Sequence, residues 1–354
     1  MVSADIAPRH RFVVLDGMRG VAALAVITDH VHAPLTEALL PGRYLAVDFF
    51  FVLSGFVMAH VYGARLASGL SPWAFLRLRA IRFYPLYILA AVMGGALMAL
   101  HALHGWNEAT LPHVAGSMLF AAAFLPTPPA VSIWPDAPFP LNGPSWSLFF
   151  ELFINAVFAF IILWLTPRRA ALIALGGAAA LVAYSTLTGE LGGGFRWSNF
   201  LGGFARVTLG FFAGVCIYQM RGKVRAPVLP AVAGFAVLLA TMMIHAPGPS
   251  RIVVDMIASI VVFPLLVMTC ADSKASGAFA GACAWMGLIS YGVYVLHVPL
   301  WGWLRVLMGA VGVTLPDIGD VVAVALLAVA AAWFLDKVYD APVRRWLSRR
   351  RSGV

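Results

Sequence analysis

Long apolar runs alternate with short polar connections along this chain, and the length of the runs indicates what they form. A helix needs about 20 apolar residues to cross the hydrocarbon core of a bilayer. Runs of about this length predict ten membrane-spanning helices, at residues 13–33, 45–62, 83–104, 145–165, 170–188, 202–220, 228–246, 251–271, 285–308 and 320–338. The pattern therefore predicts an all-α, polytopic integral membrane protein.

One further apolar run, residues 113–125, is shorter and is bounded by Pro112 and Pro126. If this run does not cross the bilayer, the basic residues of the connections all fall on one side, which the positive-inside rule assigns to the cytoplasm. If it crosses, Arg168 and Arg169 break that pattern. We therefore predict a re-entrant or interfacial segment on the outer side, with both chain termini in the cytoplasm.

The composition leaves little room for a soluble domain, because 62% of the residues are hydrophobic and only 11% are charged. We expect residues 1–346 to form one transmembrane domain and residues 347–354 to form a basic cytoplasmic tail. The net charge of +9 does not indicate nucleic-acid binding, since the basic residues cluster in the short connections. Cys216, Cys270 and Cys283 lack metal-ligand spacing, so no metal site is expected.

Two ionisable side chains, Arg19 and His30, lie in the first predicted span, where placing such groups in a membrane is energetically unfavourable. Ionisable groups at membrane depth indicate a functional site by default. The two residues are 11 positions apart, which at about 100° per residue places both on one helix face, roughly 16 Å apart along the axis. One face of this helix therefore carries a cation near one end and a candidate base near the other. The alternative for Arg19 is that it extends towards the inner membrane surface.

His30, Asp48 and Glu151 fall near the predicted outer ends of spans one, two and four, and they form the candidate catalytic group. A neutral imidazole suits general-base work near pH 7, and either carboxylate would orient it. Each residue also has a structural interpretation. His30 would be hydrogen-bonded at the membrane interface, Asp48 would be a first-turn acid favoured by the helix dipole, and Glu151 would pair with an arginine.

Arg79 and Arg82 lie at the inner end of the third predicted span, three residues apart and therefore on one helix face. Two neighbouring guanidinium groups suit phosphate recognition. The alternative is that these arginines determine topology or contact lipid phosphates.

Four further residues are candidate substrate contacts. Trp146 and Ser147 stand beside Glu151, where Trp146 is either an aromatic anchor at the membrane interface or a surface on which a sugar stacks. Ser147 lacks the G-x-S-x-G context of a nucleophilic serine. Tyr291 and His297 lie in the ninth predicted span, where His297 either lines the substrate pathway or is a packed histidine.

Several segments resemble the acyltransferase-3 family of membrane O-acyltransferases, which acylate bacterial surface polysaccharides and related glycans. The five segments are LDGMRGVAAL…DH, VDFFFVLSGF (47–56), FLRLRAIRFYPLY (75–87), GPSWSLFFELF (143–153) and ISYGVYVLHVPL (289–300). In the first segment Arg19 and His30 form an Arg-x10-His pair. In the third, Arg79 and Arg82 form an Arg-x-x-Arg pair. One position departs from the pattern. Family members often carry two adjacent acidic residues after Trp-Ser-Leu, whereas Glu151 is followed by Leu152.

This resemblance implies transfer of an acyl group, which we expect to be acetyl, from cytoplasmic acyl-coenzyme A to a hydroxyl of a cell-surface or exported carbohydrate. His30 would act as the base or carry the acyl group itself, Arg79 and Arg82 would bind the donor, and Arg19 would lie on its path. It also implies a location in the bacterial inner membrane.

From the residues alone, a secondary transporter or channel with a buried ionisable pathway is the alternative. The chain's other half holds no second copy of the Arg-x10-His segment, which counts against a repeat-built transporter.

Overall fold

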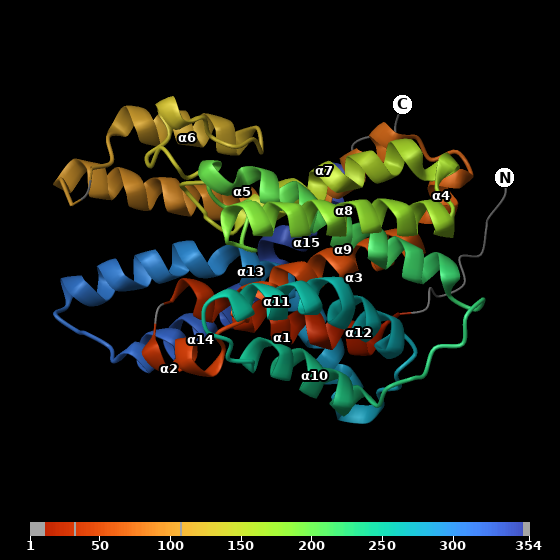
Figure 1. Ribbon diagram of the computed structural model, residues 1–354. Coiled ribbons are helices and arrows are strands. Elements are labelled where there is room, and N and C mark those ends of the chain that lie inside the picture. Colours follow the sequence, from red (N-terminus) through yellow and green to blue (C-terminus); the bar gives the residue numbers. More distant parts are fainter. Residues whose placement is uncertain (1–10, 32, 107, 350–354) are drawn as a thin grey trace.

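The computed structural model describes residues 11–31, 33–106 and 108–349, and over these residues the chain is a bundle of helices without a β-strand (Figure 1). Of the residues that the structure describes, 79% are helical, which confirms the all-α class. The α-helices are α1 (Val13–His30), α2 (Pro34–Leu39), α3 (Ala46–Met58), α4 (Ala64–Ala67), α5 (Pro72–His104), α6 (Leu111–Ala122), α7 (Ser145–Ile161), α8 (Pro167–Thr188), α9 (Phe200–Met220), α10 (Ala231–Met243), α11 (Pro249–Ile257), α12 (Phe263–Cys270), α13 (Gly277–Ala310), α14 (Asp317–Leu335) and α15 (Ala341–Arg349). Three π-helical segments join neighbouring helices, namely η2 (Ala59–Gly63), η6 (Ala258–Val262) and η7 (Asp336–Asp340).

Among the described residues, eight helices are long and apolar enough to cross a membrane, and each contains one of the ten predicted spans to within a residue or two. The other two predicted spans are shorter as helices. The first is α1, which has 18 residues and includes Asp16, Arg19 and Asp29. The seventh is α10, which has only 13 residues, because Pro230 precedes it and the backbone is extended at Ile244. The prediction of a 19-residue helix at 228–246 is therefore wrong in length.

Two of the long helices begin and end with the same local signals. Ser71 caps α5 by accepting a hydrogen bond from the amide of Ala74, and Thr166 caps α8 in the same way. A proline follows each cap at the first helical position, where the missing N–H costs nothing. Gly105 and Gly189 end the helices with φ of +64° and +74°, a conformation that favours glycine.

The helix α5 begins earlier than the predicted third span, so the basic stretch before that span is helical. Its 33 residues give a length of about 50 Å. Arg79 and Arg82 consequently lie in the second and third turns of α5, inside the bundle. The predicted short segment 113–125 corresponds to α6, a 12-residue helix that lies beside the far end of α5 (Figure 1). Its position relative to the bilayer stays a prediction.

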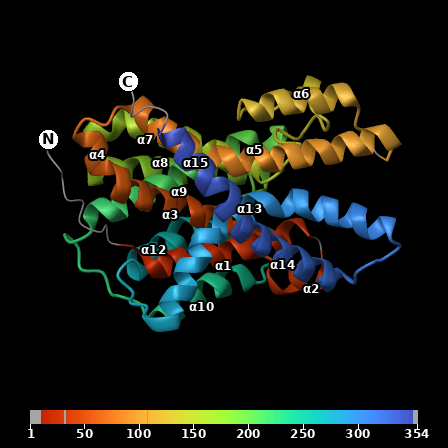
Figure 2. The ribbon, with the colours of Figure 1, turned by 180° about the vertical axis from the view of Figure 1, so that it is seen from behind.

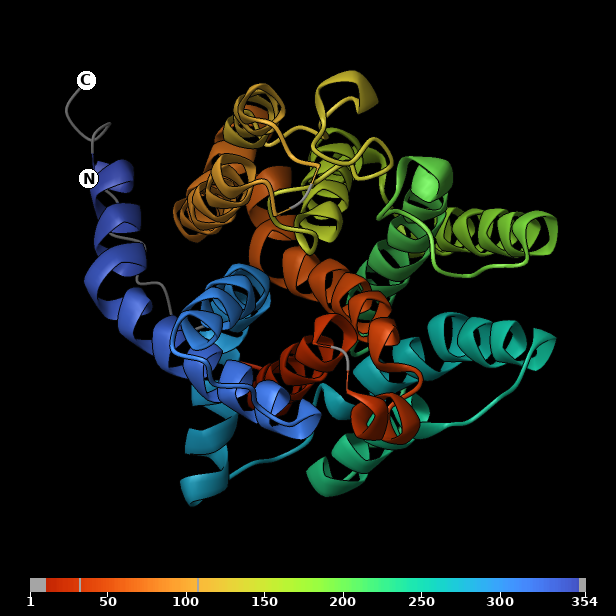
Figure 3. The ribbon, with the colours of Figure 1, turned by 90° about the vertical axis from the view of Figure 1, so that its left-hand side faces the viewer.

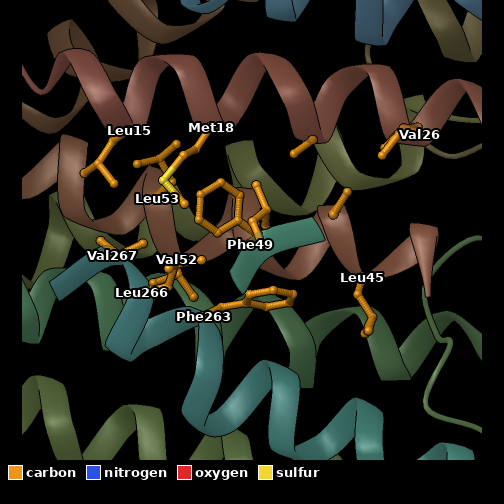
Figure 4. Close-up of a cluster of buried hydrophobic side chains, with 14 of the residues drawn as sticks. Leu15, Met18, Val26, Leu45, Phe49, Val52, Leu53, Phe263, Leu266 and Val267 are labelled. Atoms are coloured by element: carbon orange, nitrogen blue, oxygen red, sulfur yellow. The ribbon is translucent and has the colours of Figure 1, made fainter. Parts of the chain in front are cut away.

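Viewed along the bundle, α1 and α3 lie in the interior and the other helices surround them (Figure 3). A hydrophobic cluster joins them to α12 (Figure 4). The members labelled in Figure 4 are Leu15, Met18 and Val26 of α1, Leu45 just before α3, Phe49, Val52 and Leu53 of α3, and Phe263, Leu266 and Val267 of α12.

The helices α1 and α13 run parallel to one another. They pack very close together because a glycine of α1, Gly20, faces α13 at the contact. A Cβ atom at Gly20 would lie 2.5 Å from the Cβ of Met286, so a larger residue would push the helices apart. Asp16 near the start of α1 lies against Gly287, and His30 at its end meets His297. This parallel register places the polar face of α1 along α13.

Connections predicted to share a side of the membrane contact one another. Asp136, in the loop between α6 and α7, accepts hydrogen bonds from the amide and hydroxyl of Ser198, and both loops were expected on the outer side. Arg221 pairs with Asp272 between two loops expected in the cytoplasm. The grouping of the loops agrees with the charge pattern, and the assignment of the sides stays a prediction.

The C-terminal helix α15 lies against the beginning of α5, on the face shown in Figure 2. Arg77 donates a hydrogen bond of 3.3 Å to the carbonyl of Leu347. The helix therefore extends into the predicted tail 347–354, of which the structure describes only the part up to Arg349.

Candidate active site

A cavity of about 380 Å³ lies between α1, α3, α5, α7 and α13. Six of the ten predicted site residues line it, namely Arg19, Arg79, Arg82, Ser147, Glu151 and Tyr291. The charged groups of the lining are three arginines and one glutamate, so the lining itself is net positive, while Asp16 and Asp340 pair with Arg19 and Arg82 from outside it. A cavity of this charge suits an anionic ligand.

Glu151 pairs with Arg79 inside this cavity. The Nη2 of Arg79 donates to Oε1 of Glu151 at 3.0 Å, and the hydroxyl of Ser54 donates to the same oxygen at 2.8 Å. Only 7% of Arg79 is exposed, and its guanidinium lies over the ring of Phe83. The structural interpretation of Glu151, pairing with an arginine, is therefore the one that the structure supports.

The depth predicted for Glu151 needs correction. The helices α5 and α7 run antiparallel, since Trp73 contacts Phe160 while Arg79 contacts Glu151. This register places Glu151 at the level of Arg79, which the sequence assigned to the inner end of its span. Glu151 is therefore a partner of Arg79 rather than the residue that orients His30.

Arg82 is held more loosely than Arg79. Its Nη1 lies 3.7 Å from Oδ2 of Asp340, and Arg344 reaches the same oxygen at 2.9 Å. The guanidinium of Arg82 also lies over the ring of Tyr291, whose hydroxyl donates to the carbonyl of Phe83. Because Asp340 is shared with Arg344, Arg82 retains capacity to bind an anion in the cavity.

Arg19 and His30 both reach α13, which confirms that they share one face of α1. Arg19 donates from Nε to the hydroxyl of Ser290 at 3.0 Å and from Nη2 to the carbonyl of Gly287 at 2.7 Å. Its side chain is 33% exposed and lines the cavity. Arg19 is therefore fixed at the cavity and does not extend towards the membrane surface.

His30 and His297 meet at the other end of this face. The Nδ1 of His30 lies 3.2 Å from Nε2 of His297 and 3.2 Å from the carbonyl oxygen of Val26. His297 is fully buried and does not line the cavity. Tyr294 lies between the cavity and the histidines, because it lines the cavity and its ring centroid lies 6.2 Å from that of His297. Its hydroxyl lies 2.6 Å from the hydroxyl of Ser147.

Asp48 does not join this group, which corrects its predicted role beside His30. Both of its carboxylate oxygens accept hydrogen bonds from Arg206 of α9, at 2.9 and 2.7 Å. Both side chains are almost completely buried, with 3% of each residue exposed. The sequence contained a signal for this pair, since Arg206, like Arg19, is an arginine inside a predicted apolar span.

Trp146 is also placed differently from both of its predicted roles. Only 8% of it is exposed, and the guanidinium of Arg206 lies 5.1 Å from its ring centroid. Phe51 and Phe150 contact the same ring. Trp146 therefore packs over the ion pair of Asp48 and Arg206, and its ring is presented neither to lipid headgroups nor to a sugar.

The donors of the cavity are suited to anions rather than to metal ions. Across the described part of the chain, no three His, Cys, Asp or Glu side chains come together as a metal-ligand cluster. The polar lining consists of guanidinium, hydroxyl and phenol groups with the single carboxylate of Glu151. Guanidinium groups bind phosphate through paired hydrogen bonds.

Comparisons with known proteins agree with the resemblance seen in the sequence. The model of the acyltransferase-3 family, described as an acyltransferase domain, matches residues 12–337. The chain is 28% identical to acyltransferase MdmB of Streptomyces mycarofaciens, over 95% of this chain and 92% of that protein. It is 41% identical to protein 2 in the picA locus of Rhizobium radiobacter, over 43% of this chain and 83% of that protein.

A third relative matches over a shorter stretch. The exopolysaccharide production protein ExoZ of Rhizobium meliloti is 36% identical over 32% of this chain and 32% of its own length. No solved structure matches the chain.

Proposed function

We propose, from the premise that the chain belongs to the acyltransferase-3 family and is a multi-pass membrane acyltransferase, a specific reaction. In this reaction the protein transfers an acyl group from acyl-coenzyme A to a hydroxyl of a carbohydrate. The observation that carries the proposal is the positive cavity lined by Arg19, Arg79 and Arg82. Because the family consists of enzymes, the transporter alternative is set aside.

The arginines of the cavity are suited to the donor. Coenzyme A carries a 3′-phosphate and a pyrophosphate, and a guanidinium group binds either as a charge-assisted hydrogen-bond donor. Arg79 and Arg82 project from successive turns of α5 into the cavity, and Arg19 faces them from α1. Glu151 holds Arg79 in place through their ion pair. The donor phosphates would therefore lie between α1 and α5.

His30 is the proposed base. It lies about 16 Å from Arg19 along α1, a distance that a pantetheine arm can span. In the reaction the acceptor hydroxyl loses its proton to His30 while its oxygen forms a bond to the thioester carbon. The carbon–sulfur bond breaks, and the coenzyme A thiolate leaves and takes the proton from His30. In the other route the imidazole first carries the acyl group, and the ring nitrogen that would take the proton forms the bond to the acyl carbon instead.

The acceptor class rests on the relatives. One relative is named for exopolysaccharide production, which supports a surface or exported polysaccharide as acceptor for this chain. We propose acetyl as the acyl group. We also propose that the protein lies in a bacterial inner membrane with both termini in the cytoplasm, because the basic connections fall on one side.

The proposal is tested by comparing the surface carbohydrates of a deletion strain with those of its parent by mass spectrometry. We expect an O-acyl group in the parent that is absent from the deletion strain and restored by the wild-type chain. Membranes that contain the protein should release thiol from acetyl-coenzyme A only when the acceptor is present. Identical carbohydrates in both strains, together with no acceptor-dependent thiol release, would contradict the proposal.

A further inference from the structure

The imidazoles of His30 and His297 meet edge-on between α1 and α13. Their ring centroids lie 4.9 Å apart, and the ring planes make an angle of 66°. The nitrogen atoms that face one another are Nδ1 of His30 and Nε2 of His297, 3.2 Å apart. A neutral imidazole has one protonated and one unprotonated nitrogen, so a hydrogen bond between two neutral imidazoles fixes which nitrogen carries the proton.

The backbone carbonyls near these rings determine the direction of that bond. The Nδ1 of His297 lies 3.1 Å from the carbonyl oxygen of Val293. A carbonyl only accepts, so this nitrogen of His297 carries the proton and its Nε2 presents a lone pair to His30. The Nδ1 of His30, which also faces the carbonyl of Val26, must then be the donor. The lone pair of His30 is consequently on Nε2.

The backbone of α13 is supported beside His297. Pro299 lies inside the helix and has no N–H, so the carbonyl of Val295, four residues earlier, loses its helical partner. The side chain of Asn142 donates to this carbonyl at 3.0 Å. The loop before α7 therefore holds α13 in place two residues from His297.

We propose that His297 is a positioning residue for His30, holding its imidazole in the tautomer and orientation in which Nε2 accepts the proton of the acceptor hydroxyl. This inference rests on the proposed role of His30 as base. His297 is fully buried and outside the cavity, so it acts through His30 and not on a substrate. When His30 takes a proton at Nε2, its Nδ1–H still donates to His297, which stabilises the imidazolium as the third member of a triad does.

A matched pair of amide variants tests this role. In His297→Gln the side-chain amide lies near the position of Nε2, so its oxygen can accept the proton of His30 Nδ1. In His297→Asn the amide lies near the position of Nδ1, which keeps a donor for Val293 but removes the acceptor that His297 offers, so that the Nδ1–H of His30 retains the carbonyl of Val26 alone of the two acceptors described above. Each full-length variant is assayed in permeabilised membranes that carry the native acceptor. The assay follows labelled acetyl transfer from acetyl-coenzyme A, with the melting temperature measured on the purified protein.

We expect His297→Asn to lower the maximal rate by about 100-fold, in the range of general-base catalysis, with the Michaelis constant for acetyl-coenzyme A unchanged. His297→Gln should recover at least a tenth of the wild-type rate. If His297 had a structural role alone, the loss of rate in each variant would follow its loss of melting temperature, and the two variants would not differ otherwise. Wild-type activity of His297→Asn, or equal losses in both variants, would overturn the inference.

The variant His30→Ala separates this inference from the proposed function. If His30→Ala is inactive while His297→Asn is fully active, only the positioning role of His297 fails. If a folded His30→Ala protein is active, the proposed base fails first, and the inference about His297 fails with it.

Discussion

Asp48 and Arg206 form a two-point ion pair that joins α3 to α9 inside the bundle, with both side chains almost completely buried. The Nη1 of Arg206 also donates to the carbonyl of Gly193 at 2.9 Å, and Trp146 covers the guanidinium. The pair thus connects three parts of the chain. Removing one member of such a pair leaves a buried charge without a partner, which costs about 3–5 kcal/mol.

We therefore expect Asp48→Ala to lower the free energy of unfolding by about 3–5 kcal/mol, measured by denaturant unfolding of the purified protein in detergent. The double variant Asp48→Leu with Arg206→Met removes both charges and keeps apolar volume, so it should be more stable than Asp48→Ala. A double variant less stable than either single variant would show that the two charges are not coupled.

Arg82 should contribute to donor binding, because it lines the cavity and shares its carboxylate partner with Arg344. We expect Arg82→Ala to raise the Michaelis constant for acetyl-coenzyme A by about 10- to 100-fold, the equivalent of 1.5–3 kcal/mol for a charged hydrogen bond. Arg77 is the matched control, since it lies on the same helix but is exposed and outside the cavity. If Arg77→Ala and Arg82→Ala changed the Michaelis constant equally, both arginines would be determinants of membrane topology and not donor-binding residues.

Glu151 should act through Arg79, to which it is bonded at 3.0 Å. We expect Glu151→Ala to raise the Michaelis constant for the donor and to lower stability by about 1.5–3 kcal/mol, with the maximal rate retained. Ser54→Ala is the control, because it removes only the second donor to the same oxygen. If the maximal rate of Glu151→Ala falls 100-fold at an unchanged Michaelis constant, Glu151 is a catalytic residue instead.

Close helix packing predicts opposite effects at two adjacent glycines of α8. A Cβ at Gly177 would lie 2.5 Å from the backbone nitrogen of Leu209, whereas nothing lies within 4 Å of one at Gly176. Gly177→Ala should cost about 1–3 kcal/mol by overpacking. Gly176→Ala should be neutral or stabilising by up to about 1 kcal/mol, because alanine favours the helix. Thermal melting of the two variants in detergent measures the difference, and equal melting temperatures would contradict the packing of α8 on α9.

The sequence predicted those features that follow from a local period or length. The helical period placed Arg19 and His30 on one face, and both side chains contact α13. Helix length and hydropathy predicted the long apolar helices, whereas α10 is shorter than its apolar run because Pro230 directly precedes it and the backbone is extended at Ile244.

The pairing of polar groups between helices could not be predicted from the sequence in the same way. Asp48 and Arg206 are 158 positions apart, and Arg79 and Glu151 are 72 apart. Which side chains meet depends on the depth and rotation of each helix, and a shift of one or two residues changes the partner. The depth assigned to Glu151 had such an error, because α5 begins well before the apolar run that marked its span.

The central claim is that His30 performs the acyl transfer, and one measurement tests it most directly. It is the initial rate of labelled acetyl transfer from acetyl-coenzyme A by His30→Ala, compared with His104→Ala. His104 is an exposed histidine whose Nδ1 also contacts the carbonyl four residues earlier, so it controls for loss of an imidazole. We predict a loss of at least about 100-fold for His30→Ala at an unchanged melting temperature, and wild-type activity for His104→Ala. A folded His30→Ala protein that transfers acetyl at the wild-type rate would contradict the account.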